Sequence, residues 1–71
     1  MMRKSDEEYS RMYREKCELQ IKVDKLEAFV SKARKGEVPD TSLQEIHTLE
    51  EQLHYMRGYL RILKQRLAIV S

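Results

Sequence analysis

The chain has 71 residues, of which 37% are charged, and its formal net charge is +2. This length allows one domain with a modest core, and the near balance of charge excludes any inference about partners from net charge alone. The single cysteine, Cys17, excludes an intrachain disulfide and favours a reducing compartment. The sequence has no apolar run near the roughly 20 residues that span a bilayer, and residues 1–10 lack a signal-peptide pattern, so we expect a cytoplasmic protein without membrane contact.

One short segment interrupts an otherwise helical sequence. The stretch KGEVPDTS (35–42) contains the single proline and one of the two glycines. Gly36 suits the left-handed residue that ends many helices, and Pro39 prevents the helix from continuing. Either Thr41 or Ser42 can cap the next helix. The sequence therefore predicts a single domain made of a flexible N-terminus over 1–5, a helix over about 6–35, a loop over 36–41 and a helix over about 42–70.

Apolar residues recur at spacings of three and four along both helices, which is the pattern of a coiled-coil seam. In the first helix they are Tyr9, Met12, Leu19, Val23, Leu26, Val30 and Ala33, with Lys16 at a core-type position. In the second helix they are Ile46, Leu49, Leu53, Met56, Leu60, Leu63, Leu67 and Val70. A connection this short makes long helices antiparallel neighbours. We therefore predict an all-α hairpin, in which the acids of residues 6–18 lie beside the acid-free segment 52–71, and the bases of 32–35 face Asp40, Glu45, Glu50 and Glu51.

A second apolar stripe lies outside this seam, and one partner helix cannot cover both. An uncovered stripe of this size is a liability in a monomer, so we expect a homodimer or a dimer of dimers that forms a helical bundle. Gly58 costs about 1 kcal/mol relative to alanine in mid-helix; it either lets another backbone or a ligand approach, or is a tolerated surface glycine. The predicted interface residues are Tyr13, Phe29, Tyr55, Gly58, Tyr59, Ile62 and Ile69.

The segment HYMRGYLRILKQR (54–66) is basic and aromatic and has no acid. On a helical wheel its cations form one line and its tyrosines lie on the other side of Gly58. Guanidinium groups bind phosphate at two points, and tyrosines stack on flat rings, so this face suits an anionic ligand with a ring. The alternative is a solvated face whose charge is balanced by the acids of the first helix. The predicted ligand-binding residues are Arg14, Tyr55, Arg57, Tyr59, Arg61, Lys64 and Arg66.

Catalytic and metal-binding patterns are missing from the sequence. Cys17 has no base within a recognisable motif, and no glycine-rich phosphate loop occurs. Glu51 and His54 have the E-x-x-H spacing of di-iron bundles but lack the companion ligands that such a site needs. We therefore expect no enzyme activity, no cofactor and no metal.

Two runs of the sequence resemble a known family. EKCELQIKVDKLEAFV (15–30) fits the pattern E-K-x-E-L-x-x-K-x-x-K-L-x-x-F-[IV], and LEEQLHYMRGYLRILKQRL (49–67) fits L-x-x-Q-x-x-x-M-x-x-Y-x-x-x-L-x-x-R-[IL]. The matches that a seam does not require are Phe29, Gln52, Tyr59 and Arg66. Both patterns are similar to those of very small phage and prophage proteins that form helical hairpins. The resemblance implies a phage origin and action in the cytoplasm of an infected host.

These observations support three functions of different classes. The first is a phage accessory protein that sequesters an anionic ligand, such as a phosphate-containing nucleotide immune signal, at a subunit interface; several anti-defence proteins that take up cyclic nucleotides have a similar architecture. The second is a protein-interaction module that inhibits or bridges a host or phage protein. The third is an RNA-binding hairpin dimer, which the low net charge makes the least favoured.

Overall fold

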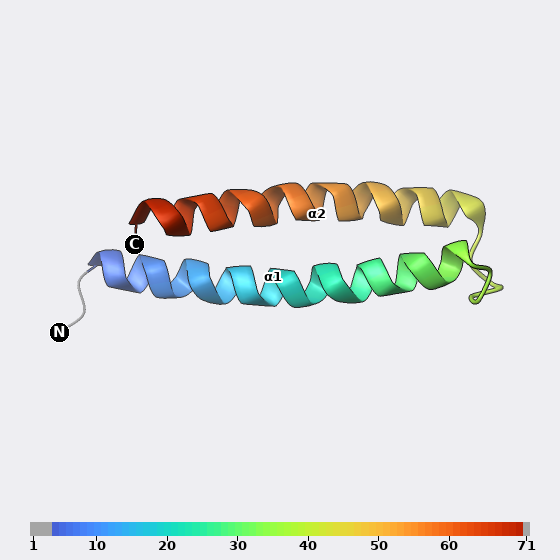
Figure 1. The fold of residues 1–71 in the computed structure, drawn as a ribbon, viewed down its shortest axis with the longest axis horizontal. Coiled ribbons are helices and arrows are strands. Elements are labelled where there is room, and N and C mark those ends of the chain that lie inside the picture. Colours follow the sequence, from blue (N-terminus) through green and yellow to red (C-terminus); the bar gives the residue numbers. More distant parts are fainter. Residues whose placement is uncertain (1–3, 71) are drawn as a thin grey trace.

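The computed structural model describes residues 4–70, which form two long helices running antiparallel to each other (Figure 1). Helix α1 spans Lys4–Arg34 and helix α2 spans Leu43–Val70. The predicted all-α hairpin is confirmed, with the two helices packed along their whole length into a rod of 53 × 17 × 13 Å. Helix α1 begins two residues earlier than expected, so Lys4 and Ser5 are helical; the rest of the N-terminus predicted to be flexible, 1–3, lies outside the described residues.

The end of α1 follows from Gly36, whose φ of 77° lies in the left-handed region. Its backbone N–H donates to the carbonyl of Ala33 at 3.1 Å, and the N–H of Glu37 donates to the carbonyl of Lys32 at 3.0 Å. These two bonds satisfy carbonyls that the last turn of a helix leaves open, in the Schellman arrangement. The predicted helix break at Gly36 is therefore confirmed, and a side chain at this position would be strained.

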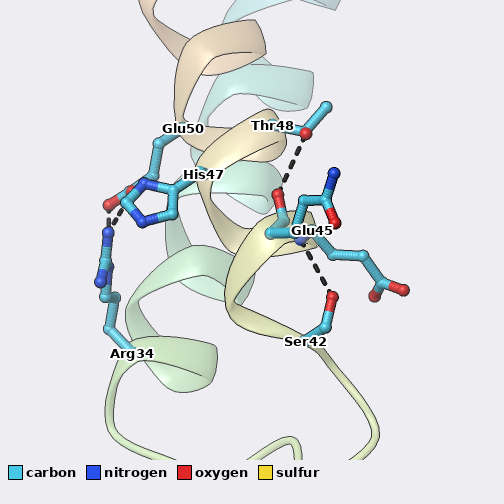
Figure 2. Close-up of polar contacts among 7 residues, drawn as sticks. Arg34, Ser42, Glu45, His47, Thr48 and Glu50 are labelled. Carbon is cyan, nitrogen blue, oxygen red and sulfur yellow. Dashed lines mark hydrogen bonds and ion pairs between the residues drawn. The ribbon is translucent and has the colours of Figure 1, made fainter.

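Helix α2 begins with a side-chain cap, and Ser42 rather than Thr41 provides it. The backbone N–H of Glu45 donates to Ser42 Oγ at 3.1 Å, which satisfies one of the open donors of the first turn (Figure 2). The hydroxyl of Thr48 donates to the carbonyl of Gln44 at 3.0 Å one turn later. Both helix ends that border the loop are thus set by local hydrogen bonds.

The core is the predicted seam. Leu63 is completely buried, with 0% of its surface exposed, and Val23 packs with Leu53 and Leu60 in the centre of the hairpin. Lys16, the polar residue of the seam, is half-buried, and its Nζ lies 4.9 Å from the ring centroid of Tyr13, as in a cation–π contact. The buried residues are Met12, Val23, Val30, Ala33, Ile46, Leu53, Leu60, Leu63 and Leu67.

The prediction that Val70 belongs to the seam is wrong. Its side chain lies in the last turn of α2 and is 48% exposed.

Candidate anion-binding face

An ion pair next to the loop uses one cation of α1. Arg34 Nε donates to Glu50 Oε2 at 3.0 Å, and Arg34 Nη2 contacts the other carboxylate oxygen of Glu50, so the pair is bidentate (Figure 2). This hydrogen-bonded contact is the main reason that the pKa of Arg34 is raised and the pKa of Glu50 is lowered. His47 Nδ1 lies 3.8 Å from Glu50 Oε1. Of the predicted contacts between the bases of 32–35 and the acids Asp40, Glu45, Glu50 and Glu51, the structure shows the one between Arg34 and Glu50, which holds Arg34 in an ion pair.

A second ion pair reaches the basic face of α2. Arg57 Nη2 lies 3.1 Å from Glu27 Oε2, with both side chains about half exposed. Such a surface pair contributes little stability and exchanges readily with solvent ions. Arg61 and Lys64 are exposed and have no ion-pair partner among the described residues. The basic face is thus only partly neutralised within the chain.

An open hollow lies over Gly58 and collects most of the predicted ligand-binding residues. Its volume is about 600 Å³, the largest of the hollows described here. A Cβ built at Gly58 would meet nothing within 4 Å, so the glycine itself leaves this surface open. The ring of His54 meets the ring of Tyr55 edge to face, with 5.5 Å between their centroids. The lining residues are His54, Tyr55, Arg57, Gly58, Tyr59, Arg61 and Ile62.

Tyr59 lines this hollow on α2 and also contacts α1. Its hydroxyl donates a hydrogen bond to Glu15 Oε1, and this bond is the main reason that the pKa of Tyr59 is raised; the nearby charge of Arg66 acts in the opposite direction. Arg66 and Glu15 line a polar hollow of about 320 Å³ together with Glu8, Arg11 and Met12. Glu15 thus accepts a hydrogen bond from Tyr59 and lines the same hollow as Arg66.

Glu8, Arg11 and Glu15 of α1 line this polar hollow and are not among the predicted site residues. The sequence predicts that the acids of 6–18 lie beside the acid-free half of α2. The hydrogen bond from Tyr59 to Glu15 joins these two segments. A helical wheel cannot show which acid meets which residue of the other helix, because that depends on the rotation and axial offset of the two helices.

Two predicted ligand-binding residues lie apart from the hollow over Gly58. Arg14 is exposed on α1 and lines none of the hollows described here. Lys64 lines a different shallow hollow of about 280 Å³, with Tyr9, Tyr13 and Lys16 of α1. The structure thus brings together Tyr55, Arg57, Tyr59 and Arg61, places Arg66 beside Tyr59, and separates the other two.

The predicted interface residues are exposed in the single chain, except Gly58, which is half-buried. Tyr13 stacks on Tyr9 with 6.3 Å between ring centroids, so it has a neighbour in its own helix. The side chains with most to gain from cover are Tyr55, 67% exposed, and Ile69, 81% exposed. Large apolar side chains that are exposed on the two helices also include Tyr13, Ile21, Phe29, Leu43, Tyr59, Ile62 and Val70.

The whole hairpin corresponds to a known family. The model of the family described as Sequestin matches residues 7–69, which include nearly all of α1 and α2. The chain belongs to the Sequestin family. No curated protein matches the chain, and neither does any solved structure.

Two further properties of the described residues bear on the site. Neither α1 nor α2 contains a stretch that is long and apolar enough to cross a lipid bilayer. Within residues 4–70 no three side chains of histidine, cysteine, aspartate or glutamate lie close enough together to hold a metal ion.

Proposed function

We propose that this protein binds and sequesters a small anionic ligand that carries phosphate groups and a flat ring, without converting it chemically. The observation that carries the proposal is the open hollow over Gly58, which combines two arginines, two tyrosines and a bare stretch of helix backbone. The name of the Sequestin family agrees with a sequestering role.

The chemistry of the hollow suits such a ligand. Arg61, which has no ion-pair partner among the described residues, offers a planar fork of donors to a phosphate group. Tyr55 and Tyr59 offer ring faces for stacking. Arg57 joins when a phosphate replaces its weak contact with Glu27. Segment 52–71 contains no acid that would repel an anion.

The resemblance to small phage proteins favours a nucleotide immune signal of the host as the ligand. In this proposal a phage makes the protein in the cytoplasm of the infected cell, and several copies assemble so that the ligand lies at a subunit interface. Uptake of the signal without turnover then lowers its free concentration and silences the defence that depends on it.

Isothermal titration calorimetry against a panel of mono-, di- and cyclic nucleotides tests the proposal. Binding to at least one nucleotide is expected at about 50 mM salt, weakening at about 200 mM salt, and chromatography should recover the ligand intact. Arg61→Gln should weaken binding by roughly tenfold or more, because it removes a charge-assisted contact. Lys25→Gln, an exposed change on α1 with the same loss of charge, is the control. If no nucleotide binds even at low salt, the proposal is wrong.

A second function is favoured by the exposure of Tyr55 and Ile69, since apolar side chains of this kind also form protein interfaces. In this alternative the chain is an interaction module that inhibits or bridges a host or phage protein. Affinity purification from host cells discriminates the two: a stoichiometric protein partner that is lost on Tyr55→Ser and retained with Arg61→Gln would favour the interaction module.

A further inference from the structure

The exposed side of α2 faces directly away from α1. Leu49 and Leu67 belong to the seam that faces α1, and each lies nine residues from Gly58. At about 100° per residue, a separation of nine residues puts Gly58 on the opposite side of the helix from both leucines. Gly58 therefore lies at the centre of the side opposite the core. We call this side the outer face of α2. It comprises Glu51, Tyr55, Gly58, Ile62 and Ile69, with Tyr59 at its edge, where the hydroxyl reaches Glu15 of α1.

Gly58 has no role in packing the described hairpin. It lies near the middle of α2, its φ is not in the left-handed region, and a Cβ would meet nothing within 4 Å. A glycine in a helix interior carries a cost in helix propensity, and close approach of another backbone is one reason for such a residue. No other element of residues 4–70 approaches Gly58, so a helix that packs on this bare backbone would have to come from another molecule.

We propose that two copies of this chain pair through the outer faces of α2, with the helices antiparallel and crossing at Gly58. The inference builds on the proposed function, because the pairing would complete the ligand site. An identical face on both copies gives a twofold symmetric interface, the commonest form of homodimer.

Charge complementarity favours the antiparallel direction. The acids of α2, Glu45, Glu50 and Glu51, all precede Gly58, whereas Arg61, Lys64 and Arg66 follow it. An antiparallel crossing at Gly58 brings Glu51 of one copy level with positions 65 and 66 of the other, so an acid meets Arg66. Glu51 has no ion-pair partner among the described residues of its own chain. In a parallel pair each cation of α2 would instead lie beside the same cation of the other chain, and the like charges would repel.

The exposed apolar area is close to what a specific pair needs. Tyr55 and Ile69 are 67% and 81% exposed, and Tyr59 and Ile62 are 43% and 46% exposed. With roughly 200 Å² per side chain, these four residues offer about 450 Å² per copy and about 900 Å² per pair. A specific interface buries about 1,000 Å² or more, which the stems of flanking arginines can supply.

Pairing also changes the ligand site. The hollow over Gly58 is open in the single chain, and in the pair the partner helix occupies its centre, so the anion would bind at the rim beside the crossing. Arg57 and Arg61 of both copies then lie around the crossing point, so four guanidinium groups repel one another when no anion is present. A bound polyphosphate relieves this repulsion, and the two equilibria are therefore linked: the anion strengthens the pairing, and the pairing strengthens anion binding.

Disulfide trapping tests the geometry. In a Cys17→Ser background, Gly58→Cys should form a disulfide-linked dimer on mild oxidation, because the two Cα atoms lie near the twofold axis. Glu51→Cys and Gln65→Cys should each fail to link to themselves and should link to each other when mixed. Self-linking at all three positions would mean a parallel pair, and no linking at any of them would mean that the outer faces do not meet; either result overturns the proposal.

Sedimentation velocity on the full chain tests the linkage, with sodium tripolyphosphate as the probe. The wild-type chain should sediment at twice its 8.5 kDa mass at micromolar concentration, and tripolyphosphate should lower the dimer dissociation constant by roughly tenfold. Gly58→Leu should raise that constant by roughly tenfold or more while circular dichroism shows an intact helical fold, because the new side chain projects into open space in the monomer. Ala28→Leu adds the same side chain at an exposed position of α1 and should leave the constant unchanged.

The outcomes separate the two proposals. A dimer trapped at Gly58 whose stability does not respond to tripolyphosphate supports the pairing and contradicts the linkage between pairing and anion binding, while the nucleotide titrations decide the proposed function. Calorimetric binding of tripolyphosphate by a chain that stays monomeric supports the anion site and overturns the pairing. A Gly58→Leu chain that dimerises as tightly as the wild type also overturns the pairing.

Discussion

Replacement of Gly58 by alanine should stabilise the isolated hairpin. The backbone at Gly58 is helical, and a Cβ built there has no neighbour within 4 Å, so alanine adds no clash. The gain is then the difference in helix propensity, about 0.8–1.0 kcal/mol. For a chain of 71 residues this corresponds to a rise in melting temperature of about 4–8 °C.

Thermal unfolding followed by far-ultraviolet circular dichroism measures this effect, at a concentration low enough for sedimentation to show monomers. Gly36→Ala is the matched comparison: it makes the same chemical change at a φ of 77°, and it should destabilise by about 1–2 kcal/mol. A lower melting temperature for Gly58→Ala at this dilution would refute the reasoning, because it would mean that the hairpin itself needs the glycine. At concentrations where copies associate, the gain should shrink or reverse.

Three further changes test the core and the two hydrogen-bonded contacts between the helices. Leu63→Ala should cost about 3–5 kcal/mol, a large share of the roughly 4–10 kcal/mol expected for this chain length, so urea unfolding should begin at much lower concentration. The pKa of Tyr59 is raised in the folded state, so its hydrogen bond to Glu15 stabilises the fold below the unfolded tyrosine pKa of about 10 and is lost as the pH rises further. The urea midpoint of the wild type should therefore fall at alkaline pH, and Tyr59→Phe should reduce that fall. The pKa of Glu50 is lowered, so its pairing with Arg34 stabilises the fold above the unfolded glutamate pKa of about 4.3 and is lost as the pH falls. Glu50→Gln should reduce the fall of the urea midpoint at acidic pH. An unchanged dependence of the midpoint on pH would mean that the pair is not formed in solution.

Much of the fold is encoded locally in the sequence. Gly36 ends α1 through its own backbone angle, and Ser42 begins α2 through a bond to a residue three positions away. The three-four spacing of apolar residues identifies the buried side of each helix, and Leu53, Leu60 and Leu63 are buried as that spacing predicts. Each of these features depends on a few neighbouring residues, which is why a sequence pattern is sufficient to find it.

The candidate site was predicted only in part. The spacing of residues 54–66 identified Tyr55, Arg57, Tyr59 and Arg61 as one surface, because they lie within two turns of a single helix. Arg14 was also selected, and the structure leaves it outside the hollows described here. A residue of α1 can be assigned to a surface of α2 only when the relative placement of the helices is known.

The sequence by itself determined two helices, the break between them, their buried sides and the acid-free stretch of α2. The tertiary structure decided which side chains meet across the hairpin: Tyr59 with Glu15, which lie 44 residues apart in sequence, and Arg57 with Glu27. It also decided that Gly58 has open space in front of it. The physical reason is that helical periodicity fixes directions around one axis, whereas contacts between two helices depend on their axial offset and rotation, which are set by the packing of the whole seam.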